Sequence, residues 1–107
     1  MGYTITPKEL KERLDRGESV RLVDVREPWE HSLAKIEGST LIPLGTLPQS
    51  LDQLKKDDDI VAYCHHGMRS ADATGFLAQQ GFTKVRNLVG GIDAWSIQVD
   101  PNVPRYR

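Results

Sequence analysis

This chain of 107 residues has only one cysteine, no long apolar run and no surplus of either charge. A single cysteine cannot form an internal disulfide, so the chain fits a reducing compartment and carries a free thiol. No stretch approaches the roughly 18 apolar residues of a membrane span, and the N-terminus lacks the basic and then apolar pattern of a secretion signal. We therefore expect a cytoplasmic protein that does not associate with membranes.

The charge balance excludes another class of partner. With 14 Lys and Arg against 15 Asp and Glu, the formal net charge of -1 provides no basic field for nucleic acid. The composition, 38% hydrophobic and 27% charged, is that of an ordinary soluble globular domain. At this length one core already buries about two thirds of the unfolded surface, so we expect residues 1–107 to form a single domain. We also expect a monomer.

Strand and helix patterns alternate along the chain. Short, mostly apolar segments predict strands at 3–5, 20–25, 40–43, 60–63 and 85–88. Helical patterns begin at Pro7 and end before Gly17, and then follow at 28–33, 47–54, 70–80 and 92–95. The alternation implies right-handed crossovers and a mainly parallel sheet with helices on both faces. The predicted fold class is α/β.

The cysteine lies between a predicted buried strand and a predicted helix. A loop of this kind directs several backbone N–H groups, and the positive end of the helix, toward one point. Cys64 as a thiolate would occupy that point, with Arg69 closing the loop, because helix N-termini and neighbouring cations favour thiolates. The alternative is a small buried apolar side chain. The place of Cys64 after the strand, before a polar loop, favours a reactive thiol.

Charged residues follow an earlier predicted strand. Asp24, Arg26 and Glu27 are expected near Cys64, because the carboxyl ends of parallel strands meet at one edge of a sheet. Asp24 and Arg26 are expected to pair, whereas Glu27 is equally well an ordinary polar strand exit. His31 is expected to be plain polar surface, since no residue near it in sequence makes it a ligand or base.

Two histidines follow the cysteine, and a metal site or a histidine base has to be considered there. Neighbouring side chains diverge and zinc needs three or four convergent ligands, so His65 and His66 predict neither a metal site nor an obligatory base. They would instead form a polar rim, and we expect no cofactor. Met68 either gives the mouth of the site an apolar contact or packs into the core.

The length of the loop separates two chemistries. A thiolate among inward N–H groups can attack a phosphoryl group or a sulfane sulfur. A phosphate needs a wide ring of donors, whereas one sulfur atom needs a smaller ring. Four residues separate Cys64 from Arg69, one fewer than in the C-x5-R spacing by which cysteine phosphatases are recognised. The short loop favours sulfur.

The sequence resembles the single-domain rhodaneses, which are thiosulfate sulfurtransferase-like proteins. The matching segments are 23–27, 36–43, 63–70 and 90–95. The resemblance implies a three-layer fold with about five mainly parallel strands. It also implies a persulfide on Cys64. The backbone of the loop would hold this persulfide, and further polar residues would support the floor of the pocket. The residues involved are His65, His66, Gly67, Met68 and Arg69 in the loop, and Ser70, Asp24 and Arg26 as supporting residues. Residues 34–39 depart from the G-H-I-x-G-A of many members. The departure affects which partner or acceptor would dock on that side of the protein, not the chemistry.

We therefore expect a sulfurtransferase that works by double displacement. Arg69 would attract a small anionic donor such as thiosulfate, and the acceptor would be cyanide, a thiol or a sulfur-carrier protein. The segment 99–106 resembles the ends of rhodanese domains fused to enzymes that activate ubiquitin-like sulfur carriers. Two alternatives are a non-catalytic rhodanese-like binding module and, less favoured by the loop length, a small cysteine phosphatase or arsenate reductase.

Overall fold

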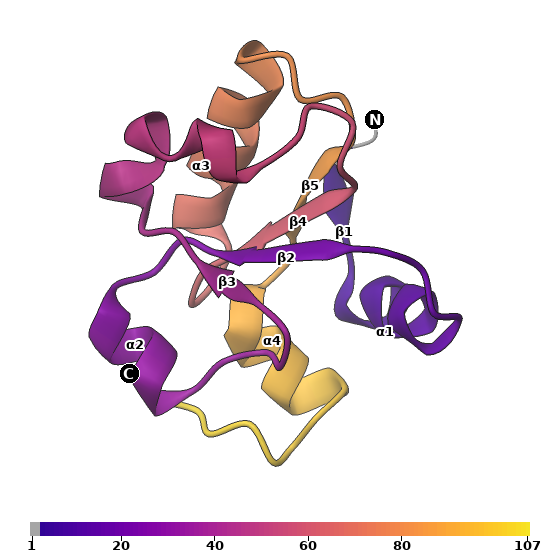
Figure 1. Cartoon of the computed structure of the whole chain (residues 1–107). Helices are drawn as coiled ribbons and strands as arrows, with labels where there is room; N and C mark the ends of the chain where they lie inside the picture. Colours follow the sequence, from indigo (N-terminus) through magenta and orange to yellow (C-terminus); the bar gives the residue numbers. More distant parts are fainter. Residues whose placement is uncertain (1–2) are drawn as a thin grey trace.

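The centre of the molecule is a sheet of five parallel strands in the order β1-β5-β4-β2-β3 (Figure 1). It is seen in a computed structural model that describes residues 3–107. The strands are β1 (Thr4–Ile5), β2 (Arg21–Asp24), β3 (Thr40–Leu41), β4 (Ile60–Tyr63) and β5 (Val85–Leu88). The sheet confirms the predicted α/β class. It places β4, the strand before Cys64, in the middle.

Helices cover both faces of the sheet. The α-helices are α1 (Pro7–Asp15), α2 (Pro28–Leu33), α3 (Met68–Gln79) and α4 (Gly91–Gln98). Two 3-10 helices, η1 (Leu44–Gln49) and η2 (Leu51–Gln53), precede β4. In Figure 1, α1 and α4 lie on one side of the sheet, while α3 and η1 lie on the other. Within residues 3–107, no helix is both long and apolar enough to cross a membrane.

Side chains of β2 and β4 alternate between two apolar cores. Val23 and Ala62 belong to the core under α3 and η1, whereas Leu22, Val61 and Tyr63 belong to the core under α1 and α4. All four residues of β4 are buried, as expected for a central parallel strand covered on both faces. The cores therefore fix the end of β4, where Cys64 begins the functional loop.

The first helix begins as the sequence predicts. The Glu9 amide donates to Thr6 Oγ1 at 3.1 Å and the Thr6 amide donates to Glu9 Oε1 at 2.9 Å, which completes a capping box. Ile5 and Leu10, which flank the cap, are buried in the same core. The chain then leaves the helix through Gly17, whose φ of 76° is in the left-handed region that suits glycine.

Three predicted helices differ from the structure. The leucines expected on one helix over 47–54 are instead divided: Leu47 lies on η1, Leu51 on η2, and Leu54 just after η2. Pro48, which has no N–H, occurs inside η1. Helix α3 begins at Met68, two residues before the predicted start, because Gly67 takes up the change of direction as its cap. Helix α4 continues to Gln98, past the predicted end at Trp95.

Candidate active site

The sulfur of Cys64 is buried in a ring of hydrogen-bond donors. Cys64 directly follows β4 and is 2% exposed. Its Sγ accepts from the Gly67 amide at 3.1 Å, from the Ser70 amide at 3.3 Å and from the Ser70 hydroxyl at 3.3 Å. Donors placed in this way stabilise negative charge on sulfur. The arrangement suits a nucleophilic thiolate better than an inert apolar side chain.

The loop takes this shape because of the way α3 begins. Gly67 caps the helix with a φ of 104°, a conformation that side chains of L-residues rarely adopt. The amides of the first turn of a helix have no partners within the helix, so the Ser70 amide is free to bind the sulfur. A Cβ atom on Gly67 would also lie 3.3 Å from the Gly90 nitrogen. The ring of donors around Cys64 Sγ therefore needs glycine at this position.

The start of α4 holds the loop from its other side. The Ile92 amide donates to the Cys64 carbonyl at 2.8 Å, and the Asp93 amide donates to the His65 carbonyl at 3.1 Å. Gly91, with a φ of 63°, packs so closely that a Cβ atom would overlap both carbonyl oxygens. The segments 63–70 and 90–95, which are distant in sequence, thus form one physical unit.

A polar residue inside β5 also reaches the ring of donors. Asn87 Oδ1 accepts from the Ser70 hydroxyl at 2.5 Å, while Asn87 Nδ2 donates to the Gly67 carbonyl at 3.1 Å. The sequence analysis missed this residue. Its signal was an amide inside a predicted strand, since an amide that a sheet partly buries needs partners.

The guanidinium of Arg69 pairs with an acid on α2. Arg69 Nη1 and Nη2 donate to the two carboxylate oxygens of Glu30 at 2.7 and 2.9 Å. This pairing, together with a hydrogen bond from Tyr106, lowers the pKa of Glu30 to about 2, although burial opposes the shift. The Arg69 side chain keeps 38% of its surface exposed. Its attraction for an anionic donor remains a prediction.

Tyr106 joins the C-terminal segment to this ion pair and was also missed. Its hydroxyl donates to Glu30 Oε2 at 2.6 Å and accepts from Arg26 Nη1 at 2.8 Å. Burial and the bond to Glu30 raise the pKa of Tyr106 to about 12, so the hydroxyl keeps its proton. The ring stacks on His65 with 3.9 Å between centroids. Two prolines had indicated only an extended tail.

Asp24 and Arg26 pair below the site, as the sequence predicts. Both are fully buried, and Arg26 donates to the two Asp24 oxygens at 2.8 and 2.7 Å. They reach the Cys64 loop through Tyr106 and Glu30. The expectation that His31 is plain polar surface is wrong: it is half-buried on α2, with its Nδ1 2.8 Å from Asp24 Oδ2. Glu27 is exposed, in line with an ordinary strand exit.

The two histidines and Met68 border the loop. His65 is half-buried between the rings of Tyr106 and His66, and burial, followed by the effect of His66, lowers its pKa. His66 is exposed. Met68 is 80% exposed, so the alternative that it packs into the core is wrong. Across residues 3–107, no group of three or more His, Cys, Asp or Glu side chains could hold a metal ion.

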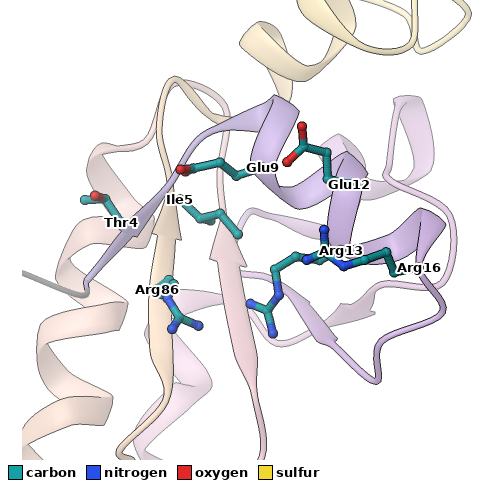
Figure 2. A pocket seen from close by; sticks show the side chains of 7 residues that line it. All are labelled: Thr4, Ile5, Glu9, Glu12, Arg13, Arg16 and Arg86. Carbon is teal, nitrogen blue, oxygen red and sulfur yellow. The ribbon is translucent and has the colours of Figure 1, made fainter.

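A separate pocket lies between α1, β1 and β5 and is lined by arginines and glutamates (Figure 2). Its cations are already paired: Arg13 with Glu18 and Asp59, Arg86 with Asp59, and Arg16 with Glu18. These pairs offset the charge that would attract an anion. No cysteine lines this pocket, and the candidate active site is therefore placed at the Cys64 loop.

Comparison with known proteins places this site in a family. The model of the family described as "Rhodanese-like domain" matches residues 6–98. The chain is 40% identical over 107 residues to the "Probable adenylyltransferase/sulfurtransferase MoeZ" of Mycobacterium tuberculosis, covering 98% of this chain but only 27% of that protein. It is 40% identical over 92 residues to a "Sulfurtransferase" of Allochromatium vinosum, covering 86% of each.

Solved structures agree with the sequence comparisons. A rhodanese-like domain protein from Staphylococcus aureus superposes with a TM-score of 0.85 at 31% identity, covering 98% of this chain and 99% of that one. The family match spans β2 to β5, the Cys64 loop and the two glycines, Gly90 and Gly91, that follow β5, and the superposition covers nearly the whole chain. The chain belongs to the rhodanese-like domain family.

Proposed function

We propose that the protein is a sulfurtransferase that carries sulfane sulfur as a persulfide on Cys64. The observation that supports this most is the buried Sγ, which accepts three hydrogen bonds within 3.3 Å at the end of the central strand. A ring this small suits one sulfur atom better than a phosphoryl group. The names of the M. tuberculosis and A. vinosum relatives, which both include sulfurtransferase, support the same reaction.

The reaction proceeds by two displacements at sulfur. The Cys64 thiolate attacks the outer sulfur of a donor such as thiosulfate, the S–S bond of the donor breaks, and sulfite leaves with the bonding electron pair. The outer sulfur of the resulting persulfide is then attacked by an acceptor such as cyanide or a thiolate. The product leaves as thiocyanate or a new persulfide, and the Cys64 thiolate is regenerated.

The loop residues have distinct roles in this proposal. The Gly67 and Ser70 amides and the Ser70 hydroxyl stabilise charge on Sγ. The backbone of the other loop residues, which are His65, His66, Met68 and Arg69, surrounds the outer sulfur. The Arg69 guanidinium, held on one edge by Glu30, offers its exposed part to an anionic donor.

The acceptor is best sought among thiols and sulfur-carrier proteins. The M. tuberculosis relative has an adenylyltransferase part in addition, and this chain spans about a quarter of its length. The adenylyl transfer activity of that larger protein therefore does not carry over. We place the protein in the cytoplasm as a monomer, with residues 1–107 as one domain.

Sulfur loading tests the proposal directly. Purified protein is incubated with thiosulfate, its intact mass is measured, and thiocyanate is quantified after addition of cyanide. We expect a gain of one sulfur atom and turnover, both absent in Cys64→Ser, since an alkoxide is not available at neutral pH. A folded wild-type protein that gains no sulfur would support the binding module instead.

A further inference from the structure

The Ser70 hydroxyl has one proton and two acceptors within reach. One is Cys64 Sγ at 3.3 Å and the other is Asn87 Oδ1 at 2.5 Å. A serine hydroxyl can donate only one hydrogen bond at a time. The shorter distance assigns the proton to Asn87 when the sulfur carries no charge. A lone pair of Ser70 Oγ then remains to accept from the Cys64 thiol.

The orientation of the Asn87 amide is fixed by a second bond. Its Nδ2 donates to the Gly67 carbonyl at 3.1 Å, so Oδ1 is the atom that faces Ser70. A flipped amide would place its oxygen against the Gly67 carbonyl oxygen, so that two acceptors would face each other with no proton between them. The acceptor for Ser70 is therefore built into β5 and cannot turn away.

We propose that Asn87 is a positioning residue that competes with Cys64 for the Ser70 hydroxyl proton and thereby disfavours the free thiolate. When the Cys64 thiol loses its proton to water, the hydroxyl rotates from Asn87 Oδ1 to the charged Sγ. The bond to Asn87 breaks and the bond to sulfur forms. The thiolate thus gains one donor only by leaving a partly buried amide oxygen without its partner, which costs free energy.

Because of this competition, the Ser70 hydroxyl has different partners in the two states of the proposed reaction, the free Cys64 thiolate and the Cys64 persulfide. In a persulfide the negative charge lies on the outer sulfur, so the inner Sγ is again a weak acceptor. The Ser70 hydroxyl then returns to Asn87, and the pair stabilises the loaded state relative to the free thiolate. This consequence rests on the proposed sulfurtransferase function, whereas the competition itself requires only a titrating thiol.

Other titratable groups also surround the Cys64 loop and come from several elements. They are Arg69 on α3, Glu30 on α2, Asp93 on α4, Asp24 at the end of β2 with Arg26 after it, Tyr106 in the C-terminal segment, and His65 and His66 on the loop itself. The variants below retain every one of them. Their contribution is therefore common to all arms of the comparison.

The pH dependence of iodoacetamide alkylation tests the competition. Asn87→Leu removes the competing acceptor, and we expect the pH of half-maximal alkylation rate to fall by about one unit, the size of one hydrogen bond to a charged group. Ser70→Ala removes the donor and should raise that pH, while Ser70→Thr should restore it. Thr74→Val is the matched control. The Thr74 hydroxyl donates to the backbone carbonyl of Ser70 at 2.8 Å, so its loss does not remove a partner of the Ser70 hydroxyl.

A double variant separates competition from a general disturbance of the loop. In the Ser70→Ala background, Asn87→Leu should no longer shift the alkylation profile, because no proton remains to compete for. A shift of equal size with and without the Ser70 hydroxyl would overturn the proposal. Equilibrium unfolding of each variant shows that the profiles refer to folded protein.

A measurement on the wild-type protein covers the case in which a variant does not fold. The side-chain carbonyl carbon of Asn87 reports by NMR whether Oδ1 accepts a hydrogen bond. We expect its chemical shift to titrate at the same pH as alkylation of Cys64, and to stay constant in Cys64→Ala. A constant shift in the wild type would exclude the proton movement. Thiosulfate loading is measured separately, so a failure of sulfur transfer would not be confused with this result.

Discussion

The hydroxyl of Tyr106 lies 2.6 Å from the Glu30 carboxylate although 76 positions separate the two residues. Through this contact the C-terminal segment braces the acid that holds Arg69 beside the Cys64 loop. Arg26 donates to the same hydroxyl from below. The two ion pairs of the site, Asp24 with Arg26 and Glu30 with Arg69, are therefore connected by a single phenol.

Removal of that hydroxyl should weaken both the fold and the site. We expect Tyr106→Phe to lower the free energy of unfolding by about 1–2 kcal/mol, because the buried Arg26 and Glu30 side chains each lose a hydrogen-bond partner. The KM for thiosulfate should rise, since Arg69 is held less firmly. Urea unfolding and steady-state kinetics measure the two effects. Tyr3→Phe is the control, because Tyr3 is 59% exposed; equal effects of the two changes would contradict the bracing role.

Loss of the Arg69 guanidinium should affect donor binding more than chemistry. For Arg69→Ala we expect KM for thiosulfate to rise more than kcat falls, because the charge gathers the anion. The change also leaves Glu30 unpaired and should destabilise the protein. Adding Glu30→Gln should recover stability without recovering KM. An unchanged kcat/KM in Arg69→Ala would mean that the cation serves only the fold.

Glu30 should give the protein a specific sensitivity to acid. Its pKa is about 2 in the folded protein against an ordinary value of 4.5, chiefly because of Arg69. The folded state therefore binds its proton less readily than the unfolded state does. The resulting stability is fully present above pH 4.5 and is lost as the pH falls toward 2. Thermal unfolding between pH 6 and pH 2 should show a smaller loss for Glu30→Gln, and parallel curves would refute the assignment.

Of the two glycines at the start of α4, Gly90 and Gly91, the one that faces the Cys64 loop should tolerate no side chain. We expect Gly91→Ala to abolish measurable sulfur loading, or to prevent folding, because the new methyl group would overlap the Cys64 and His65 carbonyls. Gly75→Ala is the control: that glycine lies exposed within α3, with no heavy atom within 4 Å of an added Cβ atom. It should increase stability by about 0.5–1 kcal/mol. Full loading of Gly91→Ala would show that the clamp is dispensable.

Lengthening the loop should separate sulfur from phosphate chemistry. Insertion of one glycine between Gly67 and Met68 gives the C-x5-R spacing of cysteine phosphatases and moves the Gly67 and Ser70 amides apart. We expect sulfur loading to slow by about a hundredfold, the effect of losing one donor to a developing anion. Wild-type protein should not hydrolyse an aryl phosphate. Hydrolysis at a rate comparable to sulfur transfer would favour the phosphatase instead.

The sequence predicted those parts of the site that local patterns determine. The strand before Cys64, the helix after it and the capping box at Thr6 follow from residues within a few positions of one another. The pairing of Asp24 with Arg26 is equally local. Parallel packing then places the strand ends together, which is why the loop could be identified as the site.

The missed residues act across long separations. Glu30 meets Arg69 at a distance of 39 positions, and Asn87 meets Ser70 at 17. Their partners depend on how α2 and β5 pack, and no periodicity in one sequence records that. His31 was misjudged for a related reason, because the turn from β2 into α2 brings it back onto Asp24. A partly buried amide in β5 and a tyrosine after two prolines were the available signals.

The clamp formed by Gly91, and the brace formed by Tyr106, also set an order of events during protein synthesis. Cys64 leaves the ribosome before either residue, because translation runs from the N-terminus. Until β5 and α4 have been made and have docked, the loop carbonyls lack the amides of Ile92 and Asp93. A nascent chain would therefore present an ordinary cysteine, and the sulfur-carrying form would arise only once the sheet is complete.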